Sequence, residues 1–198
     1  MQKFIKVLCW VLLVSLSACH NKKAKQSSRI NNTEENQRFF PVTDFLLGQL
    51  NEIDSLPVTP LKITISDGKR DSMWLTKKDI RVFVSPFLKP VIDSISMKNY
   101  FTEQSFLDQT INAITLTYDP KIKIPDSIKL NHWDIYINPQ QSKVQRIYLV
   151  KEENIKGGTK TTQLTWKVNA WCSIRTIIQQ PNNEPRIKEE IMKWDLDD

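Results

Sequence analysis

Glycine is scarce in this chain of 198 residues: only four are present, at positions 48, 68, 157 and 158. Average proteins contain about 7% glycine. Loops that cradle phosphate need closely spaced glycines, as in G-x-G-x-x-G or G-x-x-x-x-G-K-[ST]. Because the four positions supply neither spacing, the sequence excludes both kinds of phosphate-binding loop.

Histidine is rarer still, with only His20 and His132 in the whole chain. This excludes most metal sites built from histidine, and we expect neither a metal nor a cofactor. His132 and Asp134 share one face of an expected strand, so an oriented imidazole in a hydrolase is conceivable. A surface histidine beside a strand start also explains the pair, and this explanation is preferred. Since no G-x-S-x-G elbow can be written, we expect a protein that is not an enzyme.

The chain also lacks an apolar run of about 20 residues, the length that a membrane-spanning helix needs. Its N-terminus instead has the pattern of a secretory signal over residues 1–18. Lys3 and Lys6 form a basic start, and an apolar stretch runs from Val7 to Val14. This pattern predicts export from the cytoplasm.

The signal ends in Leu16-Ser17-Ala18-Cys19. This segment resembles the lipobox of bacterial lipoproteins, in which an aliphatic and two small residues precede a cysteine. The resemblance implies cleavage before Cys19, a diacylglyceryl group on its thiol and a further acyl chain on its amino group. Several acyl chains anchor a protein stably where one is marginal. The alternative is a plain secretory signal in which Cys19 is incidental. No acidic residue directly follows Cys19, so the resemblance implies an outer-membrane position facing the periplasm.

Residues 19–38 read as the lipidated cysteine followed by a disordered tether. The stretch from 20 to 38 is polar, and Ile30 is its only aliphatic residue larger than alanine. It cannot bury enough apolar surface to offset the entropy of ordering. Residues 39–198 then form the expected single globular domain. That part holds 21 basic and 20 acidic residues, a net charge of +1 within a chain of +6. The basic excess therefore lies near the membrane anchor, and we expect no nucleic-acid partner.

Helices are expected early in this domain and strands late. Thr43-Asp44 can cap a first helix, and Thr76 with Asp79 resembles a capping box for a second. From about Ala113 apolar residues alternate with polar ones, which is typical of strands. The clearest alternation, Thr162 to Ile178, predicts one unusually long strand, whereas residues 91–111 are ambiguous. The order predicts an α+β fold: a curved antiparallel sheet with N-terminal helices packed on one face.

Aromatic residues supply the candidate binding surface. Trp171 falls on the polar face of the expected long strand, where burial does not require it. It marks a contact with a ligand or partner, or it is covered by the first helix if both faces of the sheet are buried. Trp133 and His132 complete the candidate surface. Cys172 lies on the apolar face of the same strand, where a buried small hydrophobe is expected rather than a nucleophile.

These features predict a membrane-anchored protein whose sheet and helices enclose an apolar groove. Such a groove would bind an apolar small ligand or a protein partner. The alternative is a component of envelope assembly that has a solid core and works through its surface. A hydrolase that uses His132 is the third reading.

The lipobox leads to a direct test. We expect Cys19→Ala to move the protein from the membrane fraction to a soluble fraction, because the acyl chains that hold it are lost. Fractionation followed by immunoblotting measures this. A Cys172→Ala variant is the matched control and should stay with the membrane. Unchanged membrane partitioning of Cys19→Ala would show that this residue is not the anchor.

Overall fold

The computed structural model describes residues 39–93 and 95–195. The signal peptide, Cys19 and the tether expected at 1–38 lie outside the described residues and stay predictions. Within the described part, the chain forms two α-helices, one 3₁₀ helix and nine strands. These are α2 (Val42–Ser55), β1 (Leu61–Ser66), β2 (Lys69–Trp74), α3 (Lys77–Val84), η1 (Ser85–Leu88), β3 (Phe101–Asp108), β4 (Ala113–Pro120), β5 (Leu130–Ile137), β6 (Val144–Ile155), β7 (Gly158–Lys167), β8 (Trp171–Gln179) and β9 (Arg186–Lys193).

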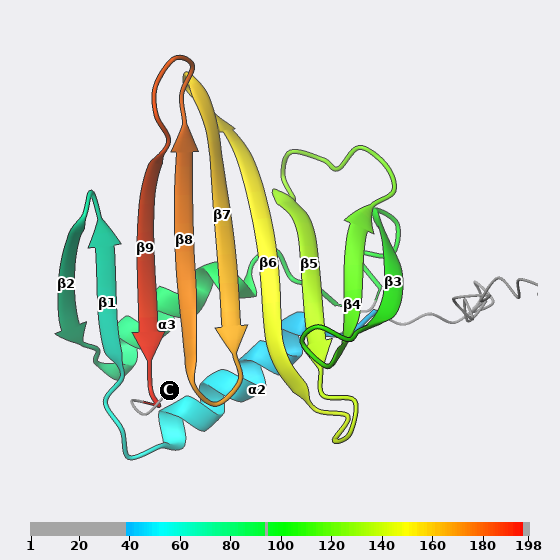
Figure 1. Ribbon diagram of the computed structural model, residues 1–198, viewed down its shortest axis with the longest axis horizontal. Helices are drawn as coiled ribbons and strands as arrows, with labels where there is room; N and C mark the ends of the chain where they lie inside the picture. Colours follow the sequence, from blue (N-terminus) through cyan, green and yellow to red (C-terminus); the bar gives the residue numbers. More distant parts are fainter. Residues whose placement is uncertain (1–38, 94, 196–198) are drawn as a thin grey trace, which may run out of the picture. The chain divides into compact units, whose positions relative to one another are not determined.

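All nine strands belong to one open antiparallel sheet (Figure 1). The strand order is β2-β1-β9-β8-β7-β6-β5-β4-β3. From β3 to β9 each strand pairs with the next along the chain, as hairpins do. The first hairpin, β1–β2, instead joins the sheet beside the last strand, β9. The first hairpin and β3 therefore occupy opposite edges of the sheet.

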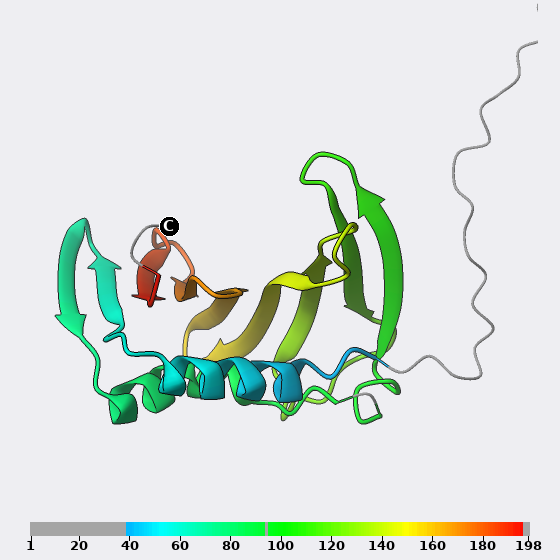
Figure 2. The same ribbon diagram turned by 90° about the horizontal axis from the view of Figure 1, so that it is seen from below.

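This topology makes the chain pass across one face of the sheet. Helix α2 crosses before β1, and α3 with η1 crosses between β2 and β3. Figure 2 shows the helices on one side of the sheet and the two edges bending away from them. One face is thus covered by helices, which we call the helix-covered face. The opposite face is concave, and we call it the open face.

Large apolar side chains fill the space between the helices and the sheet. Trp133 is stacked on Tyr118 with ring centroids 4.5 Å apart, and the ring of Phe101 meets it at 4.6 Å. Phe87 of η1 packs edge-on against Trp166 at 5.4 Å. Trp133 and Trp166 have at most 1% of their surface exposed, so the core is closed around them.

Each helix buries one stripe of its surface. In α2 the buried apolar residues are Val42, Leu46, Leu50 and Ile53, which recur at helical spacing. The expected cap is wrong for this helix, because Pro41 takes the N-cap position. The hydroxyl of Thr43 instead accepts a hydrogen bond of 2.8 Å from the backbone N–H of Ile92. Thr43 therefore ties the start of α2 to the segment that follows η1.

The capping box predicted for the second helix is confirmed. The Thr76 hydroxyl accepts from the backbone N–H of Asp79, and the Asp79 carboxylate accepts from the backbone N–H of Thr76 at 3.0 Å. The α-helix ends at Val84, and Pro86 lies in the first turn of the 3₁₀ helix that continues it. Proline favours this place because it has no N–H to leave unpaired.

The long strand predicted from Thr162 to Ile178 is wrong: the structure has two strands there, β7 and β8. A turn of three residues, Val168–Asn169–Ala170, separates them, and Asn169 has a φ of +64°. Asparagine tolerates this left-handed backbone better than most residues. Because the turn has an odd number of residues, even-numbered residues pair with even-numbered ones, as Trp166 does with Cys172. The alternation therefore continues through the turn and imitates a single strand.

The fold class is confirmed in part. The sheet is antiparallel and carries helices, but the helices are few, and only α2 precedes the sheet. The segment 91–111, which was ambiguous from the sequence, contains the edge strand β3. Turns at residues 95–100 precede this strand. The hairpin β1–β2 turns at Asp67 and Gly68, both with positive φ, as the residue types predict.

The core leads to a matched pair of tryptophan variants. We expect Trp166→Ala to lower the free energy of unfolding by about 3–5 kcal/mol, because it leaves a large cavity at a closed site. Trp74→Ala should change it by less than about 1 kcal/mol, since 57% of Trp74 is exposed. Urea unfolding measures both. Equal losses in the two variants would contradict the packing described here.

Candidate functional site

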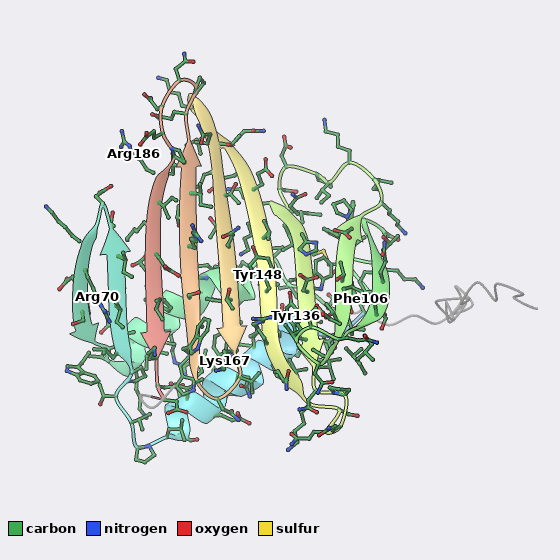
Figure 3. All side chains as sticks on the ribbon, in the orientation of Figure 1. Arg70, Phe106, Tyr136, Tyr148, Lys167 and Arg186 are labelled. Atoms are coloured by element: carbon green, nitrogen blue, oxygen red, sulfur yellow. The ribbon has the colours of Figure 1, made fainter. Side chains whose placement is uncertain are left out.

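A row of four side chains crosses the open face near one end of the sheet. Trp171 of β8 is opposite Lys167 of β7, which is opposite Arg146 of β6, which is opposite Tyr136 of β5. Directly opposed residues of antiparallel strands place their side chains on the same face, about 5 Å apart. Figure 3 shows Tyr136 and Lys167 on the side turned to the viewer, with the helices behind the sheet.

This row lines a groove of about 680 Å³, which we call the Trp171 groove. Three turns frame it: one between β3 and β4, one between β5 and β6, and one between β7 and β8. Its lining includes the cationic residues Lys143, Arg146 and Lys167 and no acidic residue. The side chain amides of Asn138, Gln141, Gln145 and Asn169 belong to the same lining. The groove is therefore basic and rich in hydrogen-bonding groups.

Arg146 is held by the neighbouring tyrosine. Its guanidinium lies 4.2 Å from the ring centroid of Tyr136, a cation–π arrangement. The hydroxyl of Tyr136 donates to Asp134 at 3.2 Å. Burial and the nearby Asp134 charge raise the pKa of Tyr136, so this hydroxyl keeps its proton and remains a donor. The tyrosine thus links the groove to a polar cluster on the same face.

That cluster is centred on His132. Its Nε2 lies 3.0 Å from Asp134, and its Nδ1 lies 2.8 Å from Asp119. The hydrogen bond with Asp134 is the largest cause that raises the pKa of His132 to about 9, and Asp119 adds to it against the opposing effect of burial. Both nitrogens of the resulting imidazolium donate hydrogen bonds. His132 is consequently a fixed cation at neutral pH.

Asp134 accepts hydrogen bonds from three sides. Besides His132 and Tyr136, the hydroxyl of Thr117 donates to it at 2.7 Å. Burial alone would raise the pKa of Asp134, but the bonds from His132 and Thr117 outweigh burial and lower it. The carboxylate therefore stays ionised and fixed in place.

This geometry limits the chemistry that His132 can perform. A general base needs a lone pair directed at the proton that it removes. In the charged state both ring nitrogens of His132 carry protons and face carboxylates, so neither has a lone pair to offer. Cys172 is buried on the other face, and burial raises its pKa well above the usual value. The arrangement supports ion pairing and positioning.

The predicted site residues separate in the structure. Trp171 lies half-buried in the lining of the groove, and His132 lies on the same open face. Trp133 is fully buried on the helix-covered face, because neighbours along a strand point to opposite sides. The sequence reasoning missed Lys143, Arg146 and Lys167. Tyr136 alternates visibly with the apolar residues of β5, which was the one signal available for this part of the site.

A second cavity, of about 530 Å³, lies by the loop between β4 and β5. Its charged lining is of mixed sign, and Glu153 there binds both Lys129 and Lys160. These two lysines lower the pKa of Glu153 to about 2. Nearby, Lys151 donates to the carbonyl groups of Pro86 and Lys89, and burial lowers its pKa to about 8. The charged groups of Glu153 and Lys151 thus bind other groups of the same chain.

None of the helices formed by the described residues is long and apolar enough to cross a membrane. The same residues contain no group of three or more His, Cys, Asp or Glu placed to hold a metal ion. Comparisons with protein-family models, curated proteins and solved structures found no match to this chain.

The His132 cluster predicts a dependence of stability on pH. The folded-state pKa of about 9 exceeds the ordinary 6.5, so protonation favours folding fully below pH 6.5, and this contribution is lost as pH rises toward 9. The shift corresponds to at most about 3 kcal/mol. Solvent at the partly exposed ring reduces that amount.

NMR titration of the His132 ring protons measures the effect directly. The midpoint should lie near 9 and fall in Asp134→Asn, with a smaller fall in Asp119→Asn, because Asp134 makes the larger contribution. His132→Gln assigns the signal and should flatten the loss of stability between pH 6.5 and 9. A midpoint near 6.5 in the unaltered protein would contradict the two ion pairs.

Proposed function

We propose that this chain is a lipid-anchored, non-enzymatic binding protein of the bacterial cell envelope. Cys19 would hold it to the outer membrane, facing the periplasm, and the open face of the sheet would bind a ligand or partner. The lipobox supports the anchor. The observation that carries the binding function is the Trp171 groove on a concave, uncovered face.

The proposed ligand site differs from the one expected from the sequence. Sequence reasoning placed an apolar groove between the helices and the sheet. Trp133, Trp166 and their neighbours pack against one another there. The open face offers a groove instead, and its lining is basic and polar rather than apolar. We therefore propose a polar or charged ligand.

One observation favours the second reading, a component of envelope assembly. Every residue of the edge strand β2 is exposed, and 52% of Met73 is accessible. An edge strand presents unpaired backbone groups that can pair with a strand of another protein. Binding of a protein at β2 would place this chain in an assembly.

Photo-crosslinking in cells separates the two readings. A photoreactive phenylalanine analogue replaces Tyr148 on the open face, Met73 on β2, or Val82 on the outer surface of α3, where 66% is exposed. We expect a discrete adduct from Tyr148 and none from Val82, because the binding face opposes the helices. An adduct from Met73 alone would favour assembly through the edge strand. Equal labelling at Tyr148 and Val82 would contradict a binding role for the open face.

A further inference from the structure

The Trp171 groove combines three kinds of group that together specify a ligand class. We infer that it binds an acidic saccharide: a sugar chain that carries carboxylate or phosphate groups. This inference rests on the proposed binding function and adds the chemistry of the ligand to it.

The first component is positive charge. Lys143 and Arg146 line the groove, and no acidic residue does. The cation–π contact with Tyr136 orients the guanidinium of Arg146. An oriented guanidinium offers a planar set of N–H donors that matches the paired oxygens of a carboxylate or phosphate. The groove thus favours an anion.

The second component is an aromatic platform. Trp171 begins β8 immediately after the turn at Asn169, and its half-buried side chain lines the groove. Two strand spacings, about 10 Å, separate Trp171 from Arg146 in their row. A ligand that contacts both must therefore extend beyond a single anion. An inorganic phosphate ion could reach Arg146 but would leave Trp171 unused.

The third component is the set of four amides, from Asn138, Gln141, Gln145 and Asn169. The Oδ1 of Asn138 already accepts from the backbone N–H groups of Gln140 and Gln141, at 2.8 and 3.0 Å, so this amide offers its N–H donors to a ligand. An amide side chain can otherwise both donate and accept hydrogen bonds, which matches sugar hydroxyls that do the same. The groove volume of about 680 Å³ lies within the usual range for small-molecule sites. Charge, platform and amides together fit an acidic sugar better than an apolar molecule or a bare anion.

Isothermal titration calorimetry on the full chain in detergent tests the ligand class. The probes are a galacturonic acid tetrasaccharide, a phosphorylated mannose oligosaccharide, a neutral galactose tetrasaccharide, inorganic phosphate and a short oligothymidylate. We expect at least one acidic oligosaccharide to bind about tenfold more tightly than the neutral one and phosphate. Its binding should weaken as salt is added, because ion pairs are screened.

Matched variants locate the binding. Arg146→Gln and Trp171→Ala should each weaken it by about tenfold or more. Arg175→Gln and Trp74→Ala should leave it unchanged, since these residues share the open face but lie outside the groove lining. Circular dichroism confirms that all four variants are folded.

Three results would overturn the inference: failure of both acidic oligosaccharides to bind, equal binding of the neutral one, or tighter binding of oligothymidylate. Equal effects of the groove variants and their controls would overturn it as well. The Tyr148 adduct in cells decides separately whether the open face binds at all. A persistent adduct with no saccharide binding would show that the ligand class is wrong while the proposed function stands.

Discussion

The pairing of β1 with β9 is the constraint on which the architecture depends. It places the first hairpin at one edge of a sheet whose next strand, β3, lies at the other edge. The chain must therefore cross between the edges, and α2 and the α3–η1 segment lie on the same face as it does so. Covering that face allows Trp133 and Trp166 to be buried. Burying these two side chains removes apolar surface from water, which favours the folded state.

The two faces of the sheet consequently have different roles: one packs against the helices, and the other is open. Along β4 to β7 the alternating side chains mostly separate into an apolar set under the helices and a polar set on the open face. On β1 and β9 the pattern is reversed, because Ile63 and Ile191 lie on the open face while the ion pair of Lys62 and Glu190 lies on the helix-covered face. Adjacent residues of β5 illustrate the separation: Trp133 is stacked in the core, while His132 forms ion pairs with Asp119 and Asp134. A surface free of core packing can hold charged groups at fixed positions, which a binding site for an anion requires.

Local patterns predicted the capping box at Thr76 and the strand-rich region after Ala113, because each depends on residues close in sequence. They failed where partners are distant. The alternation across residues 162–178 hid a turn. Because the turn has three residues, even-numbered residues stay on the same face of the sheet in β7 and β8. The sequence singles out Trp171 as an outlier, but Arg146 and Tyr136, which lie in the same row, join it only through the register of four strands. No pattern within one strand reveals that register.

The same register gives His132 a part in keeping the groove cationic. Asp134 is the diagonal neighbour of Arg146 across β5 and β6, within reach of a long side chain. Left alone, this carboxylate would attract the guanidinium and cancel its charge. Instead the oxygens of Asp134 accept from His132, Thr117 and Tyr136, and Arg146 lies over the tyrosine ring. A protonated histidine thus offsets the charge of Asp134, so that the arginine remains a recognition group for negative charge from outside.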